Sequence, residues 1–454
     1  MTPVFKKDDK SDKSNYRPIS ILPNLSKVYE RIMQNQIYPY LNKIFSKYQC
    51  GFRKGFSAQH CLIAMIEKWR KSLDSGGQAA AVLTDLSKAF DCIDHELLIA
   101  KLNAYGFDNS SLTFIYSYLS GRKQRTKINS SFSCWAEILF GVPQGSILGP
   151  LLFNAYICDL FFEVSDLEYA SFADDTTPYS CLPEMIHILE KLEKGIQSMF
   201  DWFSENFLKA NADKCHLIAS SKVPVHIQIS DIKVTSESRV KLLGIHIDNR
   251  LNFDYHVSQL CKKACKKLHA LARIFKYVET SKRRILVNAF IISQFSYCPL
   301  MWMFHSRKME HSINRIHERA LRLIYPSDSK LTFKELLNKN KTVSTHQKNL
   351  QVLATEIFKA KLNISPEISK ELFSFNVRNY NFRSQSTLKR IKTNSVYFGS
   401  ESLSSLAPKI WDLVPDSFKN ENSLESLKDR IKTWTTDKCS CRICKIYIGQ
   451  VGFI

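Results

Sequence analysis

The sequence lacks several features that would place it in particular classes of protein. It has no internal repeat and no long low-complexity segment, which argues against repeat architectures. Its first residues are rich in Lys and Asp and contain no secretory signal pattern. Its 13 cysteines are odd in number and scattered, without the spacing of a disulfide framework. We therefore expect a reducing compartment and an intracellular protein of the nucleus and cytoplasm.

No apolar run is long enough to cross a membrane without interruption. Residues 285–304 come nearest, but Asn288, Gln294 and Pro299 interrupt them and basic residues flank both sides. A buried helix pair in a globular core explains this segment better, so we expect no membrane partner.

Acidic residues are in deficit, with 43 Asp and Glu against 64 Lys and Arg, which gives a net charge of +21. A surplus of this size suits a polyanionic partner, nucleic acid before membrane. A merely basic soluble protein is the alternative on charge alone. With 454 residues, 44% of them hydrophobic, the chain can bury a full core in two or three domains.

Helical and strand patterns alternate along the first 250 residues. Residues 3–21 read as a hairpin with a charged tip. Helices are expected over residues 25–41, 60–69, 94–105, 112–119, 148–160 and 183–207. Strands are expected over residues 79–86, 169–173, 216–220 and 240–247, with one more after residue 177. This alternation predicts an α+β fold.

From about residue 251 the pattern becomes helical. An apolar stripe runs along one face of the first of these helices, and Lys262, Lys263, Lys266 and Lys267 line another. We interpret the basic face as a phosphate-tracking surface, with an ordinary solvated face as the alternative.

Three aspartates stand at the ends of apolar segments. Asp85 lies in a run that reads as a buried strand, and Phe172-Ala173-Asp174-Asp175 reads as a tight turn between strands. Such acids repel each other unless cations lie between them, and Mg²⁺ is bound by a few carboxylates together with substrate phosphates. The pattern indicates two-metal phosphoryl or nucleotidyl transfer, with turn capping as the alternative for all three residues.

Further motifs surround these acids in a fixed order. They are Asn15-Tyr16-Arg17-Pro18-Ile19-Ser20, Gln49-Cys50-Gly51-Phe52-Arg53-Lys54-Gly55, Leu83-Thr84-Asp85-Leu86-Ser87-Lys88-Ala89-Phe90-Asp91, residues 141–153, the turn at residues 172–175, Asn211 with Lys214, and Leu242-Leu243-Gly244-Ile245-His246-Ile247-Asp248. Together they resemble the reverse transcriptases of non-LTR retrotransposons, most closely the jockey-like elements of animals.

The resemblance implies an α+β right-hand polymerase. Fingers and palm would occupy residues 1–230, the end of the palm and a helical thumb residues 231–330, and a mostly helical region of uncertain role residues 331–454. The implied activity is RNA-directed DNA polymerisation in target-primed reverse transcription. The implied partners are an RNA template, a DNA primer or nicked target DNA, and dNTPs.

The resemblance also assigns roles around the acids. Asp85, Asp174 and Asp175 would be catalytic and would hold two Mg²⁺ ions, with Mn²⁺ as the alternative metal. Phe90 would lie under the incoming sugar and clash with a 2′-hydroxyl, which favours deoxynucleotides. Gln144 and Gly145 would open a helix and seat the nascent base pair.

Basic residues complete the implied site. Arg17 would reach the triphosphate from the finger hairpin, with Lys7 or Lys10 assisting. Lys214 matches the family lysine that protonates pyrophosphate. Arg53 and Arg122 are candidates for template contact, with a surface role as the alternative.

The cysteine-rich end, Cys439-Ser440-Cys441-Arg442-Ile443-Cys444, also resembles the ends of such elements. A structural zinc site needs four ligands, and no histidine follows these cysteines. The motif is suggestive of metal binding, but without a fourth ligand we favour reduced surface cysteines, and a zinc site stays open as the alternative.

Two departures limit the resemblance: no endonuclease domain precedes the finger hairpin, and the segment that normally precedes the fingers is not seen either. Complete elements of this type carry an endonuclease domain ahead of the polymerase, so the chain resembles a 5′-truncated copy or a partial gene model. The endonuclease activity would then come from elsewhere. A catalytically silent nucleic-acid-binding remnant is one alternative, although the intact acids argue against it, and a maturase-like RNA-binding protein is another.

Overall fold

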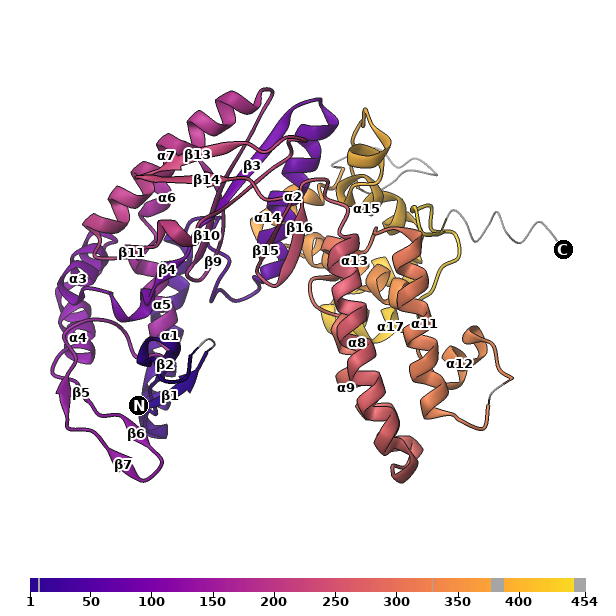
Figure 1. Cartoon of the computed structure of the whole chain (residues 1–454), viewed down its shortest axis with the longest axis horizontal. Coiled ribbons are helices and arrows are strands. Elements are labelled where there is room, and N and C mark those ends of the chain that lie inside the picture. The colour runs from indigo at the N-terminus through magenta and orange to yellow at the C-terminus, as the bar shows by residue number, and fades with distance from the viewer. Residues whose placement is uncertain (7–8, 329, 377–387, 445–454) are drawn as a thin grey trace.

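The structure, a computed structural model, describes residues 1–6, 9–328, 330–376 and 388–444. These residues form an arch with two limbs, which a β-sheet and helix α2 (Ala58–Asp74) join at the crown (Figure 1). The first limb contains the N-terminal half of the chain, and the second is helical.

The sheet at the crown has four antiparallel strands in the order β12-β3-β10-β9. Their bounds are β3 (Gln78–Leu83), β9 (Glu168–Phe172), β10 (Asp175–Leu182) and β12 (His216–Ala219). Strand β3 is buried on both faces, because Ala79 and Ala81 face the core around α2 whereas Ala80 and Val82 face a second core. Small side chains suit this central position, where helices pack closely on both sides.

The first limb carries the predicted finger hairpin, with β1 (Thr2–Phe5) paired antiparallel to β2 (Tyr16–Ile19). Its helices are α1 (Asn24–Ile44), α3 (His95–Ala104), α4 (Asn109–Leu119), α5 (Gly149–Tyr156), α6 (Leu160–Glu163) and α7 (Met185–Glu205). Short strands complete it: β4 (Leu86–Ser87), β5 (Lys123–Gln124), β6 (Lys127–Ile128), β7 (Ser131–Phe132), β8 (Ala136–Glu137), β11 (Lys209–Ala210), β13 (His226–Ile229) and β14 (Ile232–Thr235).

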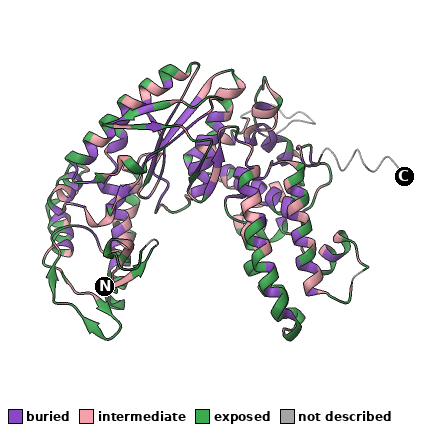
Figure 2. Ribbon diagram, in the orientation of Figure 1, coloured by how far each residue is buried: buried purple, intermediate pink, exposed green. Residues whose placement is uncertain are grey.

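The second limb begins after the hairpin of β15 (Arg239–Leu242) and β16 (Ile245–Asp248). Its helices are α8 (Asp254–Ile274), α9 (Thr280–Phe290), α10 (Pro299–Trp302), α11 (Arg307–Ile324), α12 (Phe333–Lys339), α13 (Thr345–Lys361), α14 (Glu367–Leu372), α15 (Leu403–Asp412), α16 (Asp416–Lys419) and α17 (Leu424–Ile431). One apolar core extends from α2 through these helices, and Figure 2 shows the exposed residues along their outer faces.

Helices α10 and α14 pack directly against α2, so the second limb is joined to the crown by apolar contacts. Residues 285–304 form part of α9, a 3₁₀ turn (Ile292–Phe295) and α10. Helix α10 is buried in this core as the sequence predicted, whereas Ile285 and Phe290 of α9 are 67% and 45% exposed, so the predicted buried helix pair is only half realised. Every helix in the described part of the chain is too short or too polar to cross a lipid bilayer.

Three element predictions were wrong in detail. The strand expected over residues 79–86 ends at Leu83, and the strand expected over residues 240–247 is a hairpin that turns at Leu243 and Gly244. The helix expected to open at Gln144 begins only at Gly149, because Gly145 has a φ of +112° that no helix accommodates.

Candidate active site

The three aspartates lie at one end of the crown sheet. Asp175 is the first residue of β10 and pairs with Phe172 across the hairpin, and Asp174 lies in the turn between the two strands. Thr84 continues the pairing of β3 with β10, because its backbone N–H and its hydroxyl both donate to the carbonyl of Thr176 at 3.3 and 2.6 Å. Asp85 therefore leaves the sheet next to the Asp174–Asp175 turn.

Electrostatics show that these carboxylates influence one another. The pKa of Asp175 is raised to about 6, first by desolvation and then by repulsion from Asp174 and Asp85, while Lys6 opposes the shift. The side chain of Asp175 remains accessible to solvent, but the surrounding protein displaces enough water to disfavour its charge. The oxygens of the three carboxylates do not all lie within 4.8 Å of one another.

Lys214 joins the acids from a separate part of the chain. Its Nζ lies 3.2 Å from Oδ2 of Asp85, and both side chains are about half exposed. The lysine ends a 3₁₀ turn (Ala212–Lys214) capped by Asn211, whose backbone N–H donates to the carbonyl of Asp85 at 3.1 Å. The structure thus brings together four predicted residues: the three aspartates and Lys214.

Gly51 holds the aspartate turn from behind and was not among the predicted site residues. A Cβ atom at Gly51 would lie 2.2 Å from the backbone nitrogen of Ala173, inside van der Waals contact. The neighbouring N–H of Cys50 donates to the carbonyl of Ser171 at 2.9 Å. In the sequence, the glycine at position 51 is the only signal of such a close approach.

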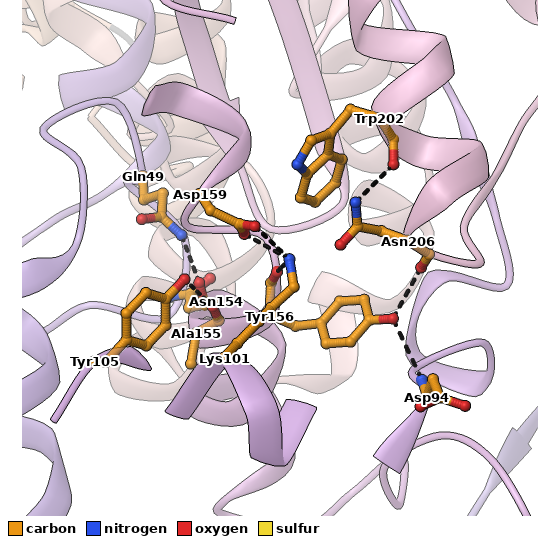
Figure 3. A network of polar contacts seen from close by, with 10 residues as sticks. All are labelled: Gln49, Asp94, Lys101, Tyr105, Asn154, Ala155, Tyr156, Asp159, Trp202 and Asn206. Carbon is orange, nitrogen blue, oxygen red and sulfur yellow. Dashed lines mark hydrogen bonds and ion pairs between the residues drawn. The ribbon is translucent and has the colours of Figure 1, made fainter. Parts of the chain in front are cut away.

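A buried polar network positions Gly51. Asn154 on α5 donates to the carbonyl of Gly51 at 2.8 Å, and Gln49 donates to the carbonyl of Asn154 at 2.8 Å. Figure 3 also shows Lys101 of α3, which contacts the C-terminal end of this helix and the loop after it. The Nζ of Lys101 lies 2.6 Å from Asp159 and 3.0 Å from the carbonyl of Tyr156.

Phe90 lies in a half-buried aromatic group. Its ring stacks on Phe153 with centroids 4.6 Å apart, and it meets Phe52 edge-on at 5.9 Å. The N–H of Val142 donates to the carbonyl of Phe90 at 2.9 Å, which joins this segment to the motif at residues 141–153.

Gln144 and Gly145 form a turn that contacts the segment after the finger hairpin. The side-chain amide of Gln144 donates to the carboxylate of Asp91 at 2.9 Å, and the backbone carbonyl of Gln144 accepts from the N–H of Ser20 at 2.8 Å. A Cβ at Gly145 would lie 3.0 Å from the carbonyl of Ser20, so only glycine fits this turn without displacement.

The three predicted arginines are not brought to the acids. Arg17 is exposed on β2, and no contact between it and the aspartates exists in the described chain. Arg53 donates to Asn42 and to the carbonyls of Ser46 and Gln49, and burial lowers its pKa.

Arg122 likewise donates to the carbonyls of Leu119 and Gly141 at 2.7 Å each, and burial lowers its pKa. Both half-buried arginines therefore bind backbone carbonyls of nearby loops, and their contact with template stays a prediction. Lys7 lies outside the described residues.

A cavity of about 690 Å³ opens beside Gln144 and is bordered by Arg122, Arg125 and Trp135. The guanidinium of Arg125 lies 4.7 Å from the Trp135 ring centroid, and Trp135 is 60% exposed. Accessible aromatic and cationic groups of this kind suit stacking and phosphate contact with single-stranded nucleic acid.

The expectation of surface cysteines at the C-terminal end was wrong. Cys439 and Cys441 are 0% and 1% exposed. In the folded chain these two cysteines pack against α13. The residues next to them in the sequence do not indicate this burial.

Comparison with known proteins identifies the family. A family model described as reverse transcriptase (RNA-dependent DNA polymerase) matches residues 5–247, so the chain belongs to the reverse transcriptase family. The chain is 27% identical over 331 residues to the probable RNA-directed DNA polymerase from transposon BS of Drosophila melanogaster, covering 68% of this chain and 36% of that protein. It is 25% identical over 263 residues to the RNA-directed DNA polymerase from mobile element jockey of the same species, covering 55% and 28%.

These relatives confirm the resemblance to jockey-like non-LTR elements that the motifs predicted. The chain spans about a third of the length of the curated relatives it matches. Among solved structures, a telomerase from Candida tropicalis in complex with a fragment of telomeric RNA has 11% identity and a TM-score of 0.38, covering 70% of this chain and 57% of that chain.

Proposed function

We propose that the chain is the RNA-directed DNA polymerase of a non-LTR retrotransposon, which transfers nucleotides from dNTPs to a primer 3′-hydroxyl on an RNA template. The convergence of Asp85 with the Asp174–Asp175 turn, through the pairing of β3 with β10, carries this proposal. Nicked target DNA would provide the primer, with the nick made by another source of nuclease.

Asp85, Asp174 and Asp175 fit the divalent ions on which reverse transcriptases generally depend. Desolvation first, and then repulsion from Asp174 and Asp85, raise the pKa of Asp175, and a divalent cation bound by these hard oxygen ligands would offset the repulsion. Two bound Mg²⁺ ions would supply charge neutralisation at the triphosphate and a lowered pKa for the primer hydroxyl.

The protein's own groups would do the remaining work. Lys214, now paired with Asp85, would turn to the departing pyrophosphate and donate a proton to it. Lys6, which lies close enough to lower the pKa of Asp175, is a better placed helper than Lys10 for holding the triphosphate.

Phe90 would select the sugar by steric exclusion of a 2′-hydroxyl, since its stack on Phe153 leaves the ring little freedom to move. The turn of Gln144 and Gly145 would support the nascent base pair through its fixed bonds to Asp91 and Ser20.

Primer extension on poly(A) RNA with an oligo(dT) primer and Mg²⁺ tests the proposal. Asp174→Asn should lower extension by at least about a hundredfold, because charge stabilisation at the reacting phosphate is lost. Binding of the template–primer, measured by fluorescence anisotropy, should change little.

Asp231→Asn is the matched control, because Asp231 is exposed in the turn between β13 and β14. Equal extension by Asp174→Asn and the unchanged chain would refute the assignment of the acids. Tight binding without extension by the unchanged chain would favour the silent remnant instead.

A further inference from the structure

A histidine and three cysteines from distant parts of the sequence meet below the crown of the arch. The ligand atoms of His346, Cys439, Cys441 and Cys444 all lie within 4.8 Å of one another. The Nε2 of His346 lies 3.2 Å from Sγ of Cys444 and 3.5 Å from Sγ of Cys441. His346 is 5% exposed, and only Cys444 is partly accessible.

The spacing fits one kind of occupant. A tetrahedral zinc ion with Zn–S bonds of about 2.3 Å and Zn–N bonds of about 2.0 Å separates its ligand atoms by about 3.5–3.8 Å. The observed separations need only small side-chain adjustments to reach these values. Three sulfurs and one imidazole are also the donor set that selects zinc over magnesium or calcium.

The surroundings give these side chains no better partner. Within the described chain the buried Nδ1 of His346 has no hydrogen-bond partner, and Nε2 of the ring contacts the sulfurs of Cys441 and Cys444. Thiols are weak donors and weak acceptors, so the cluster gains little from its own hydrogen bonds.

We propose that His346, Cys439, Cys441 and Cys444 bind a structural zinc ion that fastens the end of the described chain to α13. The protein would fill all four coordination positions, which leaves none for water or substrate and distinguishes a structural site from a catalytic one. The site shares no residue with the aspartate site, so zinc binding can be tested independently of the proposed polymerase activity.

The neighbouring contacts show what the ion would secure. Gln347 and Gln351, one helical turn apart on α13, bind backbone groups of the segment that leads to the cysteines. The amide of Gln351 donates to the carbonyls of Lys432 and Trp434 at 3.1 and 2.8 Å, and the N–H of Thr436 donates to Gln347 at 3.1 Å. Helix α13 in turn packs on α10, α11, α15 and α17. The ion would therefore attach the cysteine-containing segment to the core of the second limb.

Metal analysis of the full chain, purified under reducing conditions, tests the site. We expect one equivalent of zinc per chain, lost in His346→Ala and in Cys441→Ser. His311→Ala and Cys134→Ser are matched controls, because both residues are exposed and lie outside the cluster, and both variants should keep the zinc.

Cobalt substitution of the unchanged chain decides the matter if the two site variants fail to fold. Tetrahedral d–d bands with a thiolate-to-cobalt charge-transfer band support the site. Chelation should lower the melting temperature, and added zinc should restore it. Absence of zinc, retention of zinc in all four variants, an octahedral cobalt spectrum, or a Cys441–Cys444 disulfide in the purified chain would each overturn the proposal.

Discussion

The turn that carries Asp174 is held in place by a residue without a side chain. Gly51 lets its backbone lie against Ala173, and Asn154 fixes the carbonyl of Gly51 from α5. The position of the turn is therefore set by packing from behind, which makes Gly51 a positioning residue for the proposed chemistry.

Gly51→Ala should lower primer extension by at least about tenfold, because a shift of about an ångström in reacting groups has effects of this size. Crowding should also cost about 1–3 kcal/mol of the free energy of unfolding. Gly76→Ala is the control: Gly76 has a φ of +81° with nothing within 4 Å of a Cβ, so the change should cost stability without lowering extension. Full extension by Gly51→Ala would show that the turn tolerates movement.

Asp175 predicts a pH-dependent stability of known sign. Its pKa is raised from 3.8 to about 6 in the folded chain, so the folded state binds this proton more tightly than the unfolded state. The resulting stabilisation is fully present below about pH 3.8 and is lost as pH rises through about 6.

Asp175→Asn should therefore be more stable than the unchanged chain at pH 7 without metal. The gain should be about 1 kcal/mol, since solvent screens an accessible carboxylate, and it should vanish near pH 4. Thermal unfolding at both pH values measures it, and Mg²⁺ should raise the melting temperature of the unchanged chain more than that of the variant. Equal melting temperatures at pH 7 would contradict the coupling of the acids.

At the scale of elements, the polar network of Figure 3 joins α3, α5, α7 and the loop between α5 and α6. Lys101 is 8% exposed and contacts Asp159, and its ammonium lies 4.6 Å from the ring centroid of Trp202 on α7. Desolvation lowers the pKa of Lys101, and the carboxylate of Asp159 opposes this shift. The pair fixes α3 against the loop between α5 and α6.

Lys101→Met keeps the length and apolar stem of the side chain but leaves Asp159 and the carbonyl of Tyr156 without their donor. We expect the free energy of unfolding, measured with urea, to fall by about 1–3 kcal/mol. This is less than the usual cost of breaking a fully buried ion pair, because Asp159 can regain water. Lys27→Met, on the exposed face of α1, should change stability by less than about 0.5 kcal/mol. Equal stabilities for the two variants would show that the network does not hold these helices.

Elements with strong periodicity could be predicted from the sequence, and contacts between distant segments could not. The finger hairpin, α7, α8 and the hairpin around Asp174 follow local apolar patterns. The hairpin of β13 and β14 was missed, because two strands of four residues with exposed alternate positions give a weak pattern.

The same limit applies to the site. The acids were recognisable because their motifs are local, whereas the approach of Gly51 to Ala173 and that of His346 to the cysteines depend on tertiary packing. The motif makes Arg53 a candidate for template contact, but it gives no sign that the fold uses the guanidinium to bind the backbone carbonyls of Ser46 and Gln49.

At the scale of the whole molecule, a chain of net charge +21 forms two limbs beneath one sheet. Figure 1 shows α8 and α9 on the side of the second limb that faces the first. Helix α8 buries Val257, Ala264 and Leu268 and exposes its predicted lysines. We expect a bound nucleic acid duplex to contact this basic face.

Affinity for an RNA–DNA duplex should therefore fall steeply with salt, and α8 should account for part of the slope. Lys262→Gln with Lys266→Gln removes two exposed charges one helical turn apart. The slope of log affinity against log salt should become shallower by about 0.9 for each phosphate that the protein no longer neutralises, or nearly two in all. Anisotropy titrations between about 50 and 200 mM KCl measure this slope.

The control pair is Lys428→Gln with Lys432→Gln, which removes the same charge at the same spacing on and just after α17. If net charge alone governed binding, the two double variants would lose affinity equally and with the same change in slope. A larger change for the α8 pair would assign the phosphate contacts to the basic face of α8. Identical slopes for both pairs would instead leave α8 an ordinary solvated helix.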